Sequence, residues 1–158
     1  MHGGVEPSAS ATGLVAPTPG RRRNMQANRR RDTKPERAIR SLLHAEGFRY
    51  RCDLRIDLAA GRVRPDIVFT RRRIAVFVDG CFWHCCPVHG APPRVNTSYW
   101  APKLQRNVER DARNTRMLET EGWTVIRIWE HEDPQVAAFR IGAAVSRCEA
   151  GRAGNASS

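Results

Sequence analysis

The sequence lacks the features of a membrane or secreted protein. No apolar run approaches the roughly 20 residues that a transmembrane helix needs, which excludes an integral membrane protein. The first twenty residues contain no Lys or Arg and no continuous apolar stretch, so we expect no secretory signal. Cysteine is scarce and odd in number, with 5 residues, and the adjacent pair Cys85 and Cys86 suits metal ligation better than a disulfide framework. These absences predict a reducing, cytoplasmic compartment.

Acidic residues are few relative to basic ones. The 27 Lys and Arg outnumber the 16 Asp and Glu, which gives a formal net charge of +11 and a pI near 10.8. Such a charge favours a polyanionic partner, most often nucleic acid, although it does not choose between DNA, RNA and an acidic membrane surface. The 158 residues, 41% of them hydrophobic, suffice for one domain with a modest core.

Composition divides the chain into one domain and two tails. Residues 1–20 are rich in Gly, Ala, Ser, Pro and Thr, and residues 149–158 are similar. Neither segment buries enough apolar surface to offset its ordering entropy, so we predict disordered tails there. Residues 21–148 are predicted to form a single domain.

Periodicity and turn residues predict the elements of that domain. Thr33 and Glu36 form a capping box that opens a helix, and Gly47 ends it. Asp133 caps a last helix that has Pro134 in its first turn. Between them we predict strands at 48–52, 64–69, 74–78 and 123–129, an irregular loop at 79–93 and a helix at 98–118. This order predicts an α/β fold, a mixed central sheet flanked by helices.

Thiols and imidazoles are concentrated in the irregular loop. Cys81, Cys86 and His89 have the spacing Cys-x4-Cys-x2-His and supply three of the four ligands of a tetrahedral zinc site. His131 directly follows a predicted strand, which gives it a rigid base from which to complete the set. The alternative is ordinary buried cysteines and exposed histidines. We interpret the group as a closed, structural zinc site, in which spacing alone does not separate Cys86 from Cys85.

Two carboxylates flank the predicted hairpin. Asp66 follows Pro65 at the start of one strand, and Asp79 ends the other, thirteen residues later. Metal-dependent nucleases share this layout, because Mg²⁺ prefers one or two carboxylates, waters and a substrate phosphate. The metal polarises the phosphodiester and activates water. Pro-Asp is also a common turn dipeptide, so this motif is weak when taken alone.

His84 is a candidate general base, because neutral imidazole accepts a proton near pH 7. Asn107 and Asp111 lie four residues apart on one helix face, so Asp111 is placed to orient such a histidine. The alternatives are a surface histidine and a solvated helix face.

Phe82 and Trp83 are adjacent aromatic residues beside basic ones. Neighbours in an extended chain point in opposite directions, so the core accommodates one of them at most. Aromatic side chains on a basic surface can wedge between DNA base steps. Met25, in the basic segment that precedes the first helix, is a further candidate for this role.

These motifs together resemble the very short patch repair (Vsr) endonucleases. The resemblance extends from about Asn24 to Phe139. It is carried by Phe77-Val-Asp-Gly-Cys-Phe-Trp-His84, Arg64-Pro-Asp66, Asn107-Val-Glu-Arg-Asp111, Arg31-Asp-Thr33, Gly122-Trp123 and Trp129-Glu-His131. It implies a restriction-endonuclease-like fold and a Mg²⁺-dependent enzyme. That enzyme would nick one DNA strand 5′ of the thymine in a T:G mismatch, the product of 5-methylcytosine deamination.

The resemblance also implies roles for the matching positions. Mg²⁺ would be bound by Asp66 and the backbone carbonyl of Val78, with His84 as the base, Asp111 as its support and Glu36 as a further acidic active-site residue. The DNA-contacting positions would be Met25, Phe82, Trp83 and Asn107. The structural zinc would be held by Cys81, Cys86, His89 and His131.

The chain departs from the family beside the metal site. A Thr-His pair is typical before the Gly-Cys, whereas this chain has Val78-Asp79, so Asp79 becomes an additional candidate catalytic and metal-binding residue. Asp79 is also compatible with an alternative function, a sequence-specific restriction-type nuclease that cuts matched duplex. A second alternative is a zinc-stabilised DNA-binding module without catalysis, against which the joint presence of Asp66, His84 and Asp111 argues.

The expected setting is a monomer acting on duplex DNA in the cytoplasm, at the nucleoid. Basic residues in 21–51 and Arg71–Arg73 are candidate phosphate contacts, and Arg71–Arg73 are equally compatible with a solvated turn. Mismatch-repair factors and a cytosine-5 methyltransferase encoded nearby are partners suggested by the resemblance alone.

Overall fold

The computed structural model describes residues 32–89 and 97–154, with side-chain burial up to residue 148. Met25 and the basic residues up to 31 lie outside this part. Its elements are α2 (Lys34–Ala45), β1 (Arg51–Cys52), β2 (Ile56–Leu58), β3 (Gly61–Val63), β4 (Ile67–Phe69), the 3-10 turn η1 (Thr70–Arg72), β5 (Ile74–Asp79), α3 (Thr97–Thr120), β6 (Thr124–Trp129) and α4 (Pro134–Gly154). Within the described ranges, no helix is both long and apolar enough to cross a bilayer.

A four-stranded mixed sheet forms the centre, in the order β1-β4-β5-β6. β4 pairs antiparallel with β5, with Ile67 opposite Val76, whereas β5 and β6 are parallel, with Ile74 opposite Thr124. The carboxyl ends of β5 and β6 therefore lie side by side, and the segments that follow both strands start from the same edge of the sheet.

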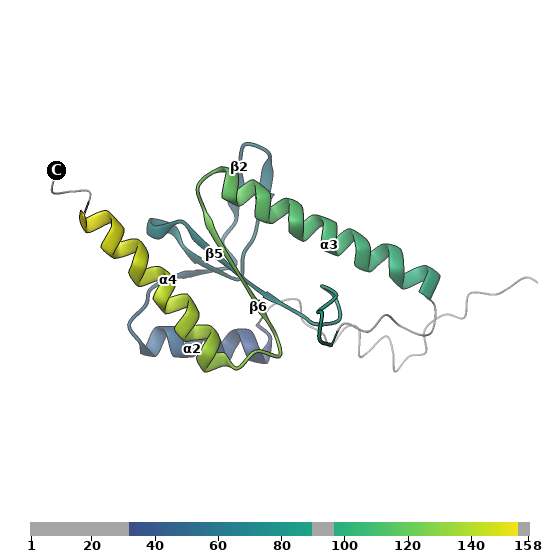
Figure 1. The fold of residues 1–158 in the computed structure, drawn as a ribbon, viewed down its shortest axis with the longest axis horizontal. Coiled ribbons are helices and arrows are strands. Elements are labelled where there is room, and N and C mark those ends of the chain that lie inside the picture. The colour runs from purple at the N-terminus through teal and green to yellow at the C-terminus, as the bar shows by residue number, and fades with distance from the viewer. Residues whose placement is uncertain (1–31, 90–96, 155–158) are drawn as a thin grey trace, which may run out of the picture. The chain divides into compact units, whose positions relative to one another are not determined.

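Helices cover both faces of this sheet (Figure 1). On one face α2 and α4 pack over Ile67, Val76 and Ile128. On the other face Leu118 of α3 packs over Val68 and Ala75, together with the small β2–β3 hairpin. Because side chains alternate along a strand, the odd-numbered residues at the end of β5 and in β6 point to the α3 face. This alternation directs Asp79 and Arg127 toward α3.

The predicted helix starts are confirmed. Thr33 caps α2 and its side chain accepts from the N–H of Glu36 at 3.4 Å. Gly47 follows the helix with φ +87°, a left-handed conformation that glycine adopts without a Cβ penalty. Asp133 Oδ1 accepts from the N–H groups of Gln135 and Val136, which caps α4. α4 continues to Gly154, past the predicted domain end at residue 148.

The strand predicted at 48–52 is mostly wrong. Only Arg51 and Cys52 pair with β4, because the rings of Phe48 and Tyr50 turn onto Phe69 at centroid distances of 6.4 and 5.9 Å. The β2–β3 hairpin was not predicted. Its two strands have three residues each, too short to show a period-2 pattern.

Candidate active site and metal centre

Asp66 lies at the start of β4, against the end of β5. Its Oδ2 accepts from the backbone N–H of Val78 at 2.7 Å. Burial raises the pKa of Asp66 to about 6; the Val78 N–H opposes this, and the negative charges of Glu36, Asp79 and Asp53 add to it. The sheet thus places a carboxylate in surroundings that favour a bound cation.

Glu36 is buried, with 3% of its surface exposed, and lies on α2. It forms an ion pair with Arg40 at 3.1 Å, one helical turn away. Its backbone N–H also completes the cap with Thr33, so the predicted capping and acidic-site positions coincide in one residue. The side chain reaches close enough to Asp66 to raise the pKa of that carboxyl.

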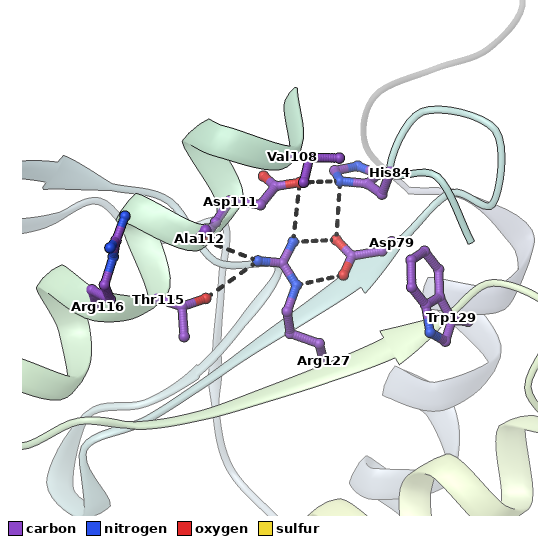
Figure 2. Close-up of a pocket in the computed structure, with 9 residues that line it drawn as sticks. All are labelled: Asp79, His84, Val108, Asp111, Ala112, Thr115, Arg116, Arg127 and Trp129. Carbon is purple, nitrogen blue, oxygen red and sulfur yellow. Dashed lines mark hydrogen bonds and ion pairs between the residues drawn. The ribbon is translucent and has the colours of Figure 1, made fainter. Parts of the chain in front are cut away.

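His84 and Asp111 meet across the cleft between the loop after β5 and α3. His84 Nδ1 and Asp111 Oδ2 are hydrogen-bonded, as the drawn side chains in Figure 2 show. Burial would raise the pKa of Asp111, but the hydrogen bond and charge of His84, with Arg127 and Arg110, hold it below its usual value. A pocket of about 490 Å³ opens beside the pair.

The carboxylate of Asp79 is already paired with an arginine and is not available as a metal ligand. Its two oxygens accept from Arg127 Nε and Nη2 at 2.6 and 2.7 Å, a bidentate pair. His84 Nδ1 is 3.6 Å from Asp79 Oδ1. Asp79, His84 and Asp111 therefore form one cluster that could in principle hold a cation, but the guanidinium of Arg127 already lies between its carboxylates (Figure 2).

Arg127 was not predicted as a residue of the site. A signal was available, because an arginine in the apolar strand Thr124–Trp129 must find an anionic partner if it is to be buried. The sequence does not identify that partner, since Asp79 lies 48 residues away.

The four predicted zinc ligands come together. Cys81, Cys86, His89 and His131 place their ligand atoms within 4.8 Å of one another. Cys81 Sγ lies 3.0 Å and Cys86 Sγ 3.7 Å from His131 Nδ1. Cys85 is exposed and outside this group, which favours Cys86 at the position that spacing left open.

The two clustered thiols differ in acidity. Burial raises the pKa of Cys81 to about 11, with the neighbouring Cys86 adding to the effect. Burial opposes ionisation of Cys86 as well, but the backbone N–H groups of His89 and Val88 lower its pKa overall. Two thiols and two imidazoles in a closed group are a donor set suited to structural zinc.

Phe82 and Trp83 belong to a larger aromatic cluster. Their ring centroids are 5.1 Å apart, and Trp100 of α3 lies 5.4 and 5.8 Å from them. Lys103 Nζ lies 5.4 Å from the Trp83 and Trp100 rings, and Phe82 is 37% exposed. The cluster is therefore a partly exposed aromatic surface that carries a positive charge.

Asn107 and Arg71–Arg73, which are candidate DNA contacts, lie in different parts of the fold. The side-chain amide of Asn107 donates to the carbonyl of Trp83 at 3.2 Å, which ties α3 to the loop. Arg71–Arg73 precede β5 and so lie at the end of that strand opposite Asp79.

Comparison with known proteins identifies the relatives of this chain. A family model described as DNA mismatch endonuclease Vsr matches residues 16–88. The type II nicking enzyme V.NaeI of Lentzea aerocolonigenes is 54% identical over 134 residues, 84% of this chain and 81% of the relative. The type II nicking enzyme V.XorIIP of Xanthomonas oryzae is 46% identical, over 77% and 88%.

The DNA mismatch endonuclease Vsr of Escherichia coli is 38% identical over 112 residues, 70% of this chain and 69% of that protein. The family-model match includes Asp66, Asp79, Cys81, His84 and Cys86. The chain therefore belongs to the Vsr family and is a DNA endonuclease, a hydrolase of phosphodiester bonds.

Proposed function

We propose that this endonuclease nicks one strand of duplex DNA 5′ of the thymine in a T:G mismatch, with Mg²⁺ as the catalytic metal and zinc as the structural one. The observation that carries the proposal is the His84–Asp111 hydrogen bond beside the strand ends that hold Asp66 and Val78. A base and a metal-binding carboxylate then act from the same edge of the sheet.

Asp66 and the carbonyl of Val78 would hold Mg²⁺. In a β-strand the N–H and C=O of one residue point to the same side, so the Val78 carbonyl faces the side from which its N–H donates to Asp66. A carboxylate and a backbone carbonyl, with the remaining positions left to water and phosphate, are a donor set that Mg²⁺ accepts. When bound, the metal polarises the phosphodiester and lowers the pKa of a bound water.

His84 would take the proton from the attacking water. Its Nδ1 is engaged with Asp111, which leaves Nε2 as the acceptor. The side chain of His84 is 20% exposed, so solvent and a DNA phosphate can approach the ring. Asp111 fixes the ring orientation and tautomer, as an acidic residue does for a catalytic histidine in general.

Zinc would stabilise the loop that contains His84. Cys81 and Cys86 lie on either side of His84 in the chain, and His131 links the loop to the end of β6. A closed set of four protein ligands leaves no position for water, which fits a structural metal.

The partly exposed aromatic cluster supports mismatch recognition. Phe82 and Trp83 lie on the loop that contains His84. Rings inserted between DNA base steps would therefore lie close to the catalytic histidine. Insertion costs a few kcal/mol of stacking, and a mismatched step reduces that cost. The names of two relatives refer to nicking and to mismatch endonuclease activity, and both are consistent with this proposal.

The test is a strand-cleavage assay with Mg²⁺ on end-labelled duplexes of randomised context, each with a single T:G pair. Matched T:A and C:G duplexes are the substrate controls, and Asp66→Asn is the protein control, since the amide oxygen can still accept from Val78. We expect one nick, 5′ of the mispaired thymine, which is absent in Asp66→Asn. Equal cutting of matched duplex would instead establish a restriction-type nuclease, and binding without any cutting would establish a DNA-binding module.

A further inference from the structure

Arg127 makes the largest set of polar contacts in the pocket. Its guanidinium binds both oxygens of Asp79, and Nη2 also lies 3.4 Å from Asp111 Oδ2. Nη1 donates to the Asp111 carbonyl and to Thr115 Oγ1, each at 3.4 Å. The carbon at the centre of the group lies 5.0 Å from the Phe77 ring centroid.

These contacts occupy the guanidinium of Arg127 with partners inside the protein. Each of its three guanidinium nitrogens has at least one oxygen partner, and the fork geometry fixes the group in one plane. Figure 2 shows the group between Asp79, at the end of β5, and Asp111, on α3. Arg127 therefore acts through these two carboxylates, without a nitrogen left over for a phosphate.

The two carboxylates compete for one donor. His84 Nδ1 is hydrogen-bonded to Asp111 Oδ2 and lies only 3.6 Å from Asp79 Oδ1. A single Nδ1–H serves one acceptor well, and the choice between them sets the direction of the opposite ring nitrogen. Asp79, with its side chain 5% exposed, is the more buried of the two and lacks access to water as an alternative partner.

We propose that Arg127 is a positioning residue: it occupies both oxygens of Asp79, leaves Asp111 as the partner of His84, and so aims His84 Nε2 at the water that attacks the scissile phosphate. The catalytic meaning of this arrangement rests on the proposed function. Asp79 stands where the typical Thr-His pattern of the family has its histidine, before the Gly-Cys. Because Asp79 pairs with Arg127, this candidate metal ligand instead helps to orient His84.

The first test measures single-turnover nicking of a T:G duplex at saturating protein, together with the Kd for that duplex in Ca²⁺. We expect Arg127→Met to slow the chemical step by about 10- to 100-fold, which is less than the roughly 10²- to 10⁴-fold that a general base contributes because His84 is misdirected and not removed, and to change the Kd by less than about twofold. A loss confined to binding, or a rate equal to that of wild type, would overturn the proposal.

Two further variants separate positioning from simple loss of charge. Asp79→Asn combined with Arg127→Met removes the competing carboxylate, so the double variant should regain most of the rate that Arg127→Met loses. Arg113→Met removes the same charge from an exposed position of α3 outside the pocket, and its rate should equal that of wild type. A double variant as slow as Arg127→Met alone, with both folded by circular dichroism, would contradict the competition between Asp79 and Asp111.

A second readout does not depend on nicking. In zinc-loaded protein, the Nδ1–H of His84 bonded to a carboxylate should give a downfield proton resonance, assigned by its loss in His84→Gln. We expect this resonance to disappear in Asp111→Asn, to persist in Asp79→Asn, and to shift in Arg127→Met. If wild type cuts no duplex, the proposed function fails while this spectrum still decides the positioning role. A resonance unaffected by Arg127→Met would overturn that role even in an active enzyme.

Discussion

Asp66 combines a functional position with a cost in stability. Its carboxyl has a pKa of about 6 in the folded protein instead of the ordinary 3.8, first because it is buried and then because Glu36, Asp79 and Asp53 are negative. A carboxyl whose folded pKa is raised destabilises the fold when it ionises. This penalty is fully present above about pH 6 and disappears as the pH falls toward 3.8, and it amounts to at most about 3 kcal/mol at 1.36 kcal/mol per pKa unit.

Replacing Asp66 with Asn should therefore stabilise the metal-free protein while abolishing nicking. At pH 8 we expect the free energy of unfolding in urea to rise by about 1–3 kcal/mol, because the amide needs no counter-ion. Adding Mg²⁺ should stabilise wild type and leave Asp66→Asn unchanged, since a ligand that binds only the folded state shifts its stability. A variant less stable than wild type at pH 8 would show that the Val78 contact outweighs the buried charge.

The same raised pKa predicts how nicking depends on metal at low pH. A protonated Asp66 cannot bind Mg²⁺, so the proton and the metal compete for the carboxylate. We expect the Mg²⁺ concentration for half-maximal nicking to be constant above about pH 7 and to rise by nearly tenfold per pH unit below pH 6. A flat Mg²⁺ requirement down to pH 5 would exclude Asp66 as the titrating ligand.

At the scale of elements, the loop after β5 is attached to the end of β6. The N–H of Cys81 donates to Glu130 Oε1 at 2.7 Å, and the N–H of Glu130 donates to the Asp79 carbonyl at 2.9 Å. His131 follows directly and contacts Cys81. The loop is thus attached to the end of β6 by these hydrogen bonds and by the contact between Cys81 and His131, which keeps His84 opposite α3.

The adjacent cysteines provide a matched test of the zinc site. Cys86→Ser should lose zinc and unfold at lower temperature, because the Cys86 thiol is buried and belongs to the group of four clustered ligands. Cys85→Ser should retain about one zinc per chain, since the Cys85 thiol is exposed and outside that group. Zinc content by mass spectrometry and the melting temperature decide between them, and equal zinc loss in both variants would contradict the assignment.

Local signals were sufficient for most elements of this fold. The capping box at Thr33 and the Asp133-Pro134 start were predicted because each depends on residues a few positions apart, and the hairpin of β4 and β5 has the same local character. Residues 48–52 were overassigned, since Phe48 and Tyr50 satisfy the core through ring contacts with Phe69 instead of strand pairing. Propensity alone does not separate these two uses of an aromatic residue.

The candidate site was predictable where motifs were dense and not where partners were distant. The Cys and His cluster was predicted from the density and spacing of these residues, with Cys85 and Cys86 not separated, and His84 with Asp111 was a candidate pair to which the family resemblance assigned roles. Asp79 was a candidate metal-binding residue, and its pairing with Arg127 was not predicted because Arg127 is 48 residues away in sequence. Register brings them together: Asp79 pairs with Trp129 and Arg127 with Phe77 in the parallel β5–β6 ladder, so their side chains meet diagonally on the α3 face.

At the scale of the whole molecule, the dominant property is charge. The net charge of +11 comes from 27 basic residues, and six of these lie in 21–31, just before the described part begins. Each phosphate neutralised by a basic side chain releases counterions, so the affinity for duplex DNA must fall with salt, with a slope of roughly −0.9 per contact in log–log form. The slope therefore counts the phosphate contacts, and variants can assign them to a segment.

Replacing the six arginines at positions 21, 22, 23, 29, 30 and 31 with Gln should weaken binding to T:G and matched duplex alike. If all six contact phosphates, the slope of log Kd against log salt should decrease by about 5, as measured by fluorescence anisotropy from about 50 to 200 mM salt. The single-turnover rate at saturating protein should stay within about twofold of wild type, because His84, Asp111 and Arg127 are unchanged. Preference for T:G over matched duplex should also persist, since phosphate contacts fix position and do not read bases. An unchanged slope would place the phosphate contacts within residues 32–154, and a lost T:G preference would give this segment a part in recognising the mismatch.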